Sequence, residues 1–203
     1  NGVLLGGSDG SNLTSLYASE SALSEYASHS QTSNSAYSLS GISTQVLVAS
    51  FTGSNSLISG DEFGYDIATS ADGKTVVASS KFSDANGTDR GAVYVFDKEG
   101  SNYTEVAILT GSDSLNDHFG ESVATSADGK TIIVGAPQDE QAGAQSNSGL
   151  AYVYDRVGNS FNQVGILTGV FADGSGDNFG QSVATSADGK TIVVGARFDE
   201  AGA

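Results

Sequence analysis

The sequence predicts an all-β fold made of β-propeller-like blades, each a sheet of four antiparallel strands. Three observations support this prediction: a long motif recurs three times, each repeat holds four strand candidates, and the composition suits short strands joined by tight turns. The 203 residues include 27 Gly and a single Pro. Polar, Gly-rich segments of this kind supply the backbone conformations that tight turns require.

The recurring motif begins at Phe63, Phe119 and Phe179, at spacings of 56 and 60 residues. It reads FGYDIATSADGKTVVASS in the first copy, FGESVATSADGKTIIVGA in the second and FGQSVATSADGKTIVVGA in the third. The second and third copies agree at 16 of 18 positions, and the first and second agree at 10. A period of this length predicts an array of units that each bury one face against a neighbour.

Four strand candidates fit within one period, as the second copy illustrates. The dipeptide Asp128–Gly129, repeated as Asp188–Gly189, provides the turn of a hairpin between the first two strands. The apolar run TIIVGA is expected to be a strand that is covered on both faces. The four predicted strands are Phe119–Thr125, Thr131–Ala136, Leu150–Tyr154 and Phe161–Leu167.

The repeats predict two complete blades flanked by two partial ones. The segment from Gln45, QVLVASFTG, corresponds to QVGILTG from Gln163, and is therefore expected to be the fourth strand of a preceding blade. The array of residues 45–203 then has eleven strands, with blade units at about 63–118, 119–178 and, in part, 179–203. A closed propeller needs four or more blades. Either further sequence completes the ring, or several chains complete it together. In the third alternative, the blades stack side by side without forming a closed ring.

Residues 1–44 differ from the repeats and predict a Ser/Ala-rich stem. Spacings of three and four residues place Leu16, Leu23, Tyr26 and Tyr37 on one stripe of a helix, although half of that stripe is Ser. Such a helix needs partner chains to fold, so we expect it to hold a homotrimer together. The alternative is an extended, flexible Ser-rich linker.

The charge and composition exclude several classes of function. A net charge of −16 disfavours binding to nucleic acids and to anionic membrane surfaces. The chain has no Cys, which excludes disulfides and thiolate metal sites. No apolar run approaches the length of a membrane span, so membrane insertion is not expected. The sequence lacks a starting Met and stops within a repeat, and we expect it to be a piece of something longer.

The residue pairs Phe63–Gly64, Phe119–Gly120 and Phe179–Gly180 are expected to have a structural role. An aromatic ring at each site would pack between adjacent sheets, and the glycine would permit close approach of the backbone. No arrangement of His, Ser and Asp suggests nucleophilic catalysis, and no carboxylate pair stands out, so we predict no catalytic residues.

Several acidic residues in the predicted loops are candidate ligands of a calcium ion. Asp61, Asp117 and Asp177 each precede a motif phenylalanine by two positions. Only the segment DANGTD, with Asp84, Asn86 and Asp89 as ligand candidates, comes near a calcium-binding loop. The alternative interpretation is a solvated acidic loop, and no other cofactor is expected.

The motif FG.SVATSADGKTI.VGA, followed by LAYVYDR and FNQVGILTG, resembles the FG-GAP repeat over residues 45–203. The Gly-Ala-Pro signature is complete once, at Gly135-Ala136-Pro137, and Gly195-Ala196 is followed by Arg197. The resemblance to the integrin α-subunit propeller implies seven blades and a calcium loop of the type D-x-N-x-D-G after the first strand. This chain has ATSADGK at that place, so the resemblance does not imply that calcium site.

The repeats and the segment GSNLT-L, Gly10 to Leu16, also resemble structural proteins of marine bacteriophages, in particular tail-fibre shafts. This implies a non-catalytic virion appendage, associated with other virion proteins, whose long loops at Lys81–Asp89 and Gln138–Ser148 attach to a host-surface glycan or protein. The alternative is a secreted or surface adhesin of bacteria with the same repeats. A polysaccharide-acting enzyme on a propeller is the least favoured interpretation.

Overall fold

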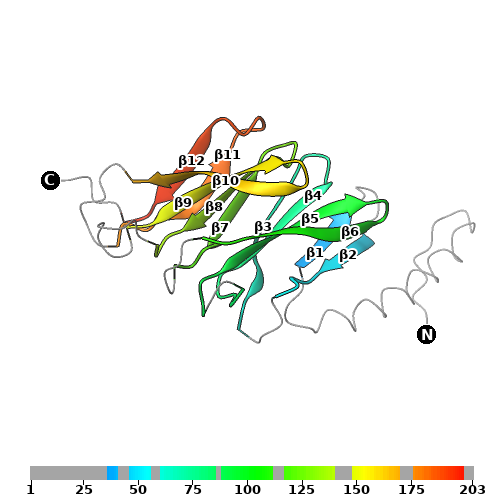
Figure 1. Cartoon of the computed structure of the whole chain (residues 1–203), viewed down its shortest axis with the longest axis horizontal. Helices are drawn as coiled ribbons and strands as arrows, with labels where there is room; N and C mark the ends of the chain where they lie inside the picture. Colours follow the sequence, from blue (N-terminus) through cyan, green and yellow to red (C-terminus); the bar gives the residue numbers. More distant parts are fainter. Residues whose placement is uncertain are drawn as a thin grey trace, which may run out of the picture.

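The fold is all-β, as predicted, and consists of propeller-like blades set side by side (Figure 1). The computed structural model describes residues 36–40, 46–55, 60–85, 88–111, 117–139, 148–169 and 176–198. These ranges form twelve strands and no helix, and every paired strand runs antiparallel to its neighbour. Consequently no helix in these ranges is long and apolar enough to cross a membrane.

Two sheets are complete blades in which the four strands follow one another in sequence order. The first full blade contains β3 (Phe63–Thr69), β4 (Thr75–Ser80), β5 (Ala92–Glu99) and β6 (Asn102–Leu109). The second full blade contains β7 (Ser122–Thr125), β8 (Thr131–Ala136), β9 (Leu150–Val157) and β10 (Ser160–Thr168). The N-terminal half-blade consists of β1 (Ala36–Ser40) and β2 (Val46–Phe51), and the C-terminal half-blade of β11 (Phe179–Thr185) and β12 (Ile192–Ala196).

The second strand of each full blade is covered on both faces. All six residues of β4 are buried, and only Thr131 of β8 is partly exposed. The outer strands β6 and β10 instead bury their residues only in part. This difference explains why TIIVGA is continuously apolar, whereas the outer strands alternate with polar residues.

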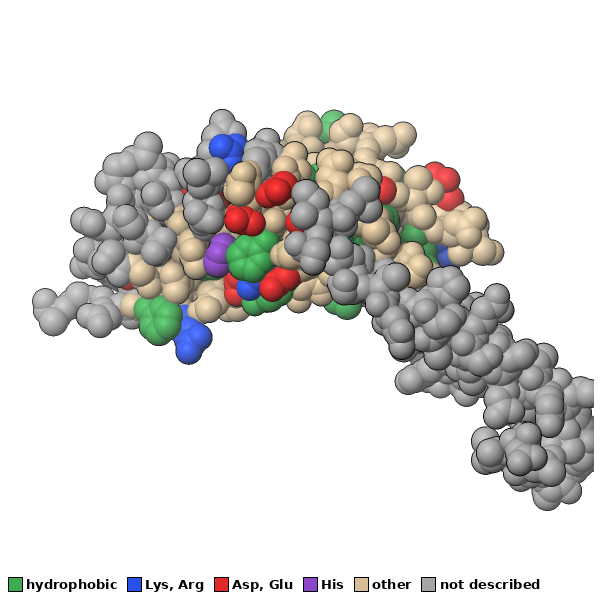
Figure 2. Space-filling model, turned by 90° about the horizontal axis from the view of Figure 1, so that it is seen from below, with side chains coloured by type: hydrophobic (Ala, Val, Ile, Leu, Met, Phe, Trp, Pro, Cys, Tyr) green, Lys and Arg blue, Asp and Glu red, His purple; other side chains and the backbone are tan. Residues whose placement is uncertain are grey.

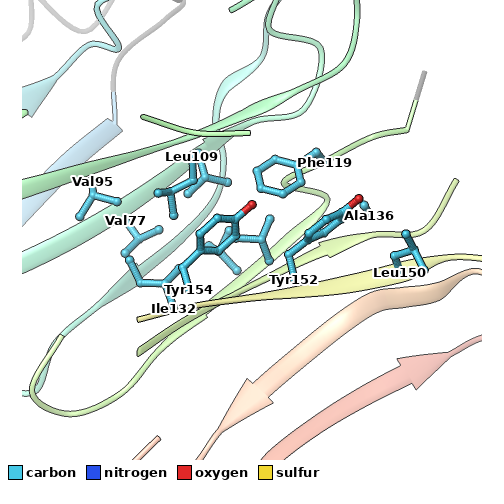
Figure 3. Packing of buried hydrophobic residues seen from close by; sticks show 12 residues of the cluster. Val77, Val95, Leu109, Phe119, Ile132, Ala136, Leu150, Tyr152 and Tyr154 are labelled. Carbon is cyan, nitrogen blue, oxygen red and sulfur yellow. The ribbon is translucent and has the colours of Figure 1, made fainter. Parts of the chain in front are cut away.

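The core lies between the sheets rather than within one of them. Phe119 and Val123 of the second full blade cluster with Val77 and Val93 of the first. Figure 3 shows the ring of Phe119 beside Tyr152 and Tyr154, with Leu109 nearby. A second cluster joins the N-terminal half-blade to the first full blade through Phe51, Phe63, Tyr94 and Phe96. Each sheet is thus stabilised mainly by its neighbours.

The prediction that Tyr37 lies on a helical stripe is wrong, because Tyr37 belongs to strand β1. There it lies opposite Ser50 of β2, and the antiparallel pairing of the two strands supplies hydrogen-bond partners for the backbone of β1. The strand also raises the number of described strands from the predicted eleven to twelve. Leu16, Leu23 and Tyr26 lie outside the described residues.

The hairpins with the sequence SADGKT are built alike in all three copies. In the first, the Asp72 carboxylate accepts hydrogen bonds from the Ser70 hydroxyl at 2.8 Å and the Lys74 amide at 3.0 Å. Successive hairpins are also connected, because the Ala71 amide donates to the Ala127 carbonyl at 2.9 Å and the Ala127 amide donates to the next copy at the same distance. These turns therefore add a hydrogen-bonded contact between neighbouring blades.

The hairpin aspartates should make folding sensitive to acid. Hydrogen bonds from the Lys74 amide and the Ser70 hydroxyl lower the pKa of Asp72 from 3.8 to about 2, and similar bonds lower the pKa of Asp128 and Asp188. A lowered pKa in the folded state stabilises the fold above pH 3.8, and this contribution is lost as the pH falls from 3.8 toward about 2.

The corresponding test compares the chain with the triple variant D72N/D128N/D188N in urea unfolding at several pH values. The difference in the free energy of unfolding between the two proteins should be constant near neutral pH and should shrink through this acidic window. If the difference in the free energy of unfolding were equal at all pH values, the charges of the three aspartates would not stabilise the fold.

Candidate recognition face

The two ends of the sheets carry connections of different length. In an antiparallel meander, successive connections alternate between the two ends of the sheet. The short turns of this chain therefore lie at one end, and the long connections lie at the other. The tight-turn face carries residues 70–74, 100–101, 126–130, 158–159 and 186–191. The long-loop face carries the described parts of the longer connections, which are residues 52–55, 60–62, 81–85, 88–91, 110–111, 117–121, 137–139, 148–149, 169 and 176–178. Of the two loops predicted to display recognition groups, the described residues of Lys81–Asp89 lie on the long-loop face, whereas most of Gln138–Ser148 lies outside the described residues.

A strained turn opens the first strand of each repeat on the long-loop face. The residue before each motif phenylalanine has a positive φ of 54°, at Glu62, His118 and Asn178. In the second copy the His118 carbonyl accepts a hydrogen bond from the Glu121 amide at 3.0 Å, and Gly120 between them has a φ of 94°. A turn with positive φ at its third residue strongly favours glycine there, which explains the Phe-Gly signature.

Acidic side chains flank these turns but lie inside the protein. Asp61 is 3% exposed, Asp117 2% and Asp177 7%. Asp139, at the start of the next long loop, is fully buried and accepts a hydrogen bond from the Tyr152 hydroxyl. In the described ranges no three His, Cys, Asp or Glu side chains are grouped so that they could hold a metal ion.

Six side chains from three long loops and β3 meet where the first and second full blades adjoin on the long-loop face. This junction cluster consists of Glu62, Tyr65, Lys81, Phe82, His118 and Glu121. Figure 2 shows this face, with the histidine beside a hydrophobic side chain and acidic groups around it. The cluster thus combines aromatic surface with both signs of charge.

Lys81 is the centre of the junction cluster. Its Nζ lies 3.4 Å from a carboxylate oxygen of Glu121, 3.7 Å from one of Glu62, and 3.7 Å from the centre of the Tyr65 ring. The Tyr65 hydroxyl in turn donates a hydrogen bond to Glu121 at 3.0 Å. Tyr65 remains 44% exposed, so this arrangement fixes an accessible aromatic ring in one orientation.

The electrostatics of the junction cluster keep Lys81 charged and favour a neutral His118. Burial opposes the charge on Lys81, but the Tyr65 hydroxyl and the carboxylate of Glu121 outweigh it and raise the pKa of the amine. Burial also lowers the pKa of His118, although Glu121 acts in the opposite direction. The Phe82 ring packs edge-on against His118 with 5.0 Å between ring centres. The cluster is therefore a rigid group of hydrogen-bonding and aromatic side chains near neutral pH.

The residues predicted from the repeated motif lie at the contacts between blades. Phe63 is 6% exposed, Phe119 is fully buried and Phe179 is partly exposed. Their glycines, Gly64, Gly120 and Gly180, occupy the strained turns, whereas Asp128–Gly129 and Asp188–Gly189 lie on the opposite, tight-turn face. The motif thus serves packing on one face and hairpin formation on the other.

The calcium candidates do not assemble into a described site. The carboxylate of Asp84 accepts a hydrogen bond from the Asp89 amide at 2.8 Å, which closes the loop on itself. Asp89 has a φ of 52°, and Asn86 lies outside the described residues. Calcium binding at this loop stays a prediction.

The sequence analysis missed the junction cluster because its residues vary between copies. Lys81–Phe82 follows the end of β4, and the same repeat position holds Pro137–Gln138 and then Arg197–Phe198. The guanidinium of Arg197 lies 4.9 Å from the ring centre of Phe198, as Lys81 lies 5.0 Å from that of Phe82. A comparison of this position across the three copies would have revealed a basic–aromatic pair in two of them.

A scan against protein-family models decides the relationship suggested by the motif. The model described as FG-GAP repeat matches residues 47–96, 103–154 and 163–203, which together make up more than half of the chain. The chain belongs to the FG-GAP repeat family. Each match begins in or near the last strand of one blade and continues into the next, which agrees with a unit that packs sheet against sheet.

Solved structures similar to this FG-GAP repeat protein include two bacterial proteins. One is a candidate 6-phosphogluconolactonase from Bacteroides fragilis, with 16% identity and a TM-score of 0.48 over 73% of this chain and 34% of that one. The other is TolB from Acinetobacter baumannii, with 21% identity and a TM-score of 0.38 over 74% of this chain and 29% of that one. The chain thus spans about a third of the length of these proteins, and no curated protein matches it.

Proposed function

We propose that this FG-GAP repeat domain is a non-catalytic scaffold whose long-loop face attaches to a surface glycan or protein. The observation that carries the proposal is the separation of loop lengths, with connections of ten or more residues on one face and six or fewer on the other. Loops held by a rigid framework are the usual place for binding residues. The junction cluster adds a fixed aromatic ring among hydrogen-bonding groups, a composition typical of recognition surfaces.

We further propose that the domain acts outside the cell, as part of a virion appendage such as a tail fibre. The acidic surface and the resemblance of the repeats to phage structural proteins support this proposal. A secreted or cell-surface adhesin of bacteria would use the same face in the same way. The reading frames next to the gene distinguish the two: virion genes favour the appendage, and a secretion or anchoring signal favours the adhesin.

The recognition proposal predicts that binding depends on the junction cluster. On an array of bacterial surface polysaccharides and proteins, the chain should bind at least one sample, and Tyr65→Ala should weaken that binding about tenfold or more because an exposed anchoring ring is lost. Lys74→Ala is the matched control, since Lys74 is exposed on the tight-turn face, with 72% of its side chain accessible. Its affinity should be unchanged.

Three outcomes would contradict the proposal. Absence of binding across the array would remove the evidence for recognition. An equal loss of affinity in Tyr65→Ala and Lys74→Ala would show that binding does not depend on the long-loop face. Turnover of a polysaccharide by the chain would instead favour an enzyme.

A further inference from the structure

The first hairpin of every repeat contains a dipeptide that is prone to a spontaneous chemical modification. An Asp followed by Gly isomerises readily, because the amide nitrogen of the glycine can attack Cγ of the aspartate without hindrance from a side chain. The Asp-Gly dipeptides of the sequence begin at Asp9, Asp72, Asp128, Asp173 and Asp188. Those of Asp72, Asp128 and Asp188 form the SADGKT turns on the tight-turn face, and the other two lie outside the described residues.

Isomerisation has two steps, and the water molecule that leaves in the first returns in the second. In the first step the glycine nitrogen forms a bond to Cγ of a neutral aspartate carboxyl group, loses its proton, and one carboxyl oxygen leaves as water. The product is a five-membered succinimide ring. In the second step water breaks one of the two bonds between the ring nitrogen and a carbonyl carbon. When the bond to the original main-chain carbonyl breaks, the product is isoaspartate, whose main chain runs through Cβ and Cγ.

The fold requires the glycine that makes these dipeptides labile. Gly73, Gly129 and Gly189 have φ values of +66°, +69° and +71°, a conformation that other residues rarely adopt. A Cβ at Gly129 would also lie 2.6 Å from Oγ1 of Thr75, and one at Gly189 would lie 2.7 Å from Oγ1 of Thr131, each in the preceding blade. A larger residue would remove the labile dipeptide but would strain the turn and its contact with that blade.

The serine two positions before each aspartate holds the carboxylate. The Ser186 hydroxyl donates a hydrogen bond to Oδ1 of Asp188 at 2.6 Å, and the Ser126 hydroxyl donates one to Oδ1 of Asp128 at 2.7 Å. Oδ1 of Asp188 also accepts a hydrogen bond from the Lys190 amide at 3.1 Å. The serine hydroxyl is the largest cause of the lowered pKa of Asp128 and Asp188. The neutral carboxyl group that succinimide formation requires is therefore scarce near neutral pH.

The same serine also holds the nitrogen that would attack. The Gly189 amide donates a hydrogen bond to the Ser186 carbonyl at 2.9 Å, and the Gly129 amide donates one to the Ser126 carbonyl at 3.0 Å. Because the ring nitrogen of a succinimide carries no proton, this hydrogen bond must break before the ring can close. One residue thus restrains both reacting groups, the carboxylate through its hydroxyl and the amide through its carbonyl.

We propose that the serine of each SADGKT hairpin protects the following Asp-Gly dipeptide from isomerisation in the folded chain. Burial does not provide this protection, because the side chains of Asp72 and Asp128 are 51% and 56% exposed. An isoaspartate would lengthen the main chain of the turn next to Ala71 and Ala127, whose amides donate hydrogen bonds to the following hairpin. Isomerisation would therefore disturb the contact between neighbouring blades.

The first test uses the unaltered chain. It is incubated at one neutral pH and one temperature, with and without guanidinium chloride, and isoaspartate is measured in its peptides by mass spectrometry with fragmentation that distinguishes the two isomers. In the denaturant all five Asp-Gly dipeptides should isomerise at similar rates. Without it the three hairpin dipeptides should isomerise at least about tenfold more slowly, since each hydrogen bond to a charged group that must break corresponds to about that factor. Equal rates in the two solutions would overturn the proposal.

The second test removes one hydroxyl and uses the other hairpins as controls in the same molecule. In the folded Ser186→Ala variant, isomerisation at Asp188 should accelerate about tenfold, because one hydrogen bond to the carboxylate is lost. Asp72 and Asp128 should keep their slow rates. Ser186→Thr retains a hydroxyl and should isomerise as slowly as the unaltered chain. An unchanged rate at Asp188 in Ser186→Ala, equal acceleration in the two variants, or equal acceleration at all three aspartates would each overturn the proposal.

A third measurement separates the hydroxyl from the backbone of the turn. The Ser186 hydroxyl also accepts a hydrogen bond from the Thr191 amide at 3.0 Å, so its loss affects more than the carboxylate. In Ser186→Ala the Gly189 amide should still exchange its proton slowly, as measured by NMR, because its acceptor is the carbonyl of residue 186. Fast exchange of this amide would assign the protection to the turn backbone instead of the hydroxyl and would overturn the proposal.

Discussion

Replacing Phe119 with alanine is expected to lower the free energy of unfolding by about 3–5 kcal/mol, the usual cost of deleting a fully buried aromatic side chain. The ring is 0% exposed and lies 5.3 Å from the ring of Tyr152 and 6.2 Å from that of Tyr154, measured between centres. It also belongs to the core cluster that contains Val77, Val93 and Leu109 of the first full blade. The loss therefore affects the contact between two blades as well as the packing within one.

Urea unfolding followed by circular dichroism would measure this effect. Phe198→Ala is the matched control, because Phe198 is 53% exposed and should cost less than about 0.5 kcal/mol. If the two variants lost similar amounts of stability, the motif phenylalanine would not be the main packing residue between the blades.

The blades were predictable because their signals are local and repeated. The Asp-Gly hairpins, the buried run in β8 and the spacing of the motif each specify structure within a few residues, and three near-copies reduce chance agreement. Four strands per period and sheet-to-sheet packing follow from those signals. The structure confirms both.

The first strand was missed because its sequence carries no such signal. Tyr37 and Leu39 alternate with Ser, and these residues are compatible with a helix that has few apolar positions as well as with a strand. What determines the strand is pairing with β2 at the register of the other repeats, including the bulge after Ser38. A comparison of SAYSLS with GLAYVY, aligned on the two tyrosines, is the only sequence evidence for it.

The aspartates near the motif show a different limit of sequence reasoning. Asp61 and Asp117 lie in loop segments and were considered as raw material for a cation site, yet both are almost fully buried. The sequence of a polar loop does not reveal which of its residues fold inward. The Ser80 hydroxyl donates a hydrogen bond to the Asp61 carbonyl at 2.6 Å, and the Gln138 amide donates one to the Asp117 carbonyl at 3.3 Å, so each loop segment packs against the end of the second strand of its own blade, about 20 residues along the chain.

The contact between blades is also expected to make Gly91 irreplaceable. Its φ is +83°, a conformation that costs an L-residue about 1–2 kcal/mol. A Cβ at this position would lie 2.1 Å from the carbonyl oxygen of Phe119 in the next blade and 2.8 Å from that of Lys81. Backbone atoms cannot move aside as a side chain can, so overpacking of about 1–3 kcal/mol adds to the conformational cost. Gly91→Ala should therefore lose about 3 kcal/mol or more.

Gly100→Ala separates the two contributions. Gly100 has a φ of +62°, and nothing lies within 4 Å of a Cβ built there, so this variant should lose only the conformational cost of about 1–2 kcal/mol. Denaturant unfolding measures the loss of unfolding free energy in each variant. The difference between the two losses is the contribution of the close contact at Gly91. Gly149, with a φ of +83° and a Cβ position 2.1 Å from the carbonyl oxygen of Phe179, repeats the arrangement one blade later. If Gly91→Ala and Gly100→Ala lost equal amounts of stability, the close approach of backbone atoms at Gly91 would be incorrect, because nothing lies within 4 Å of a Cβ at Gly100.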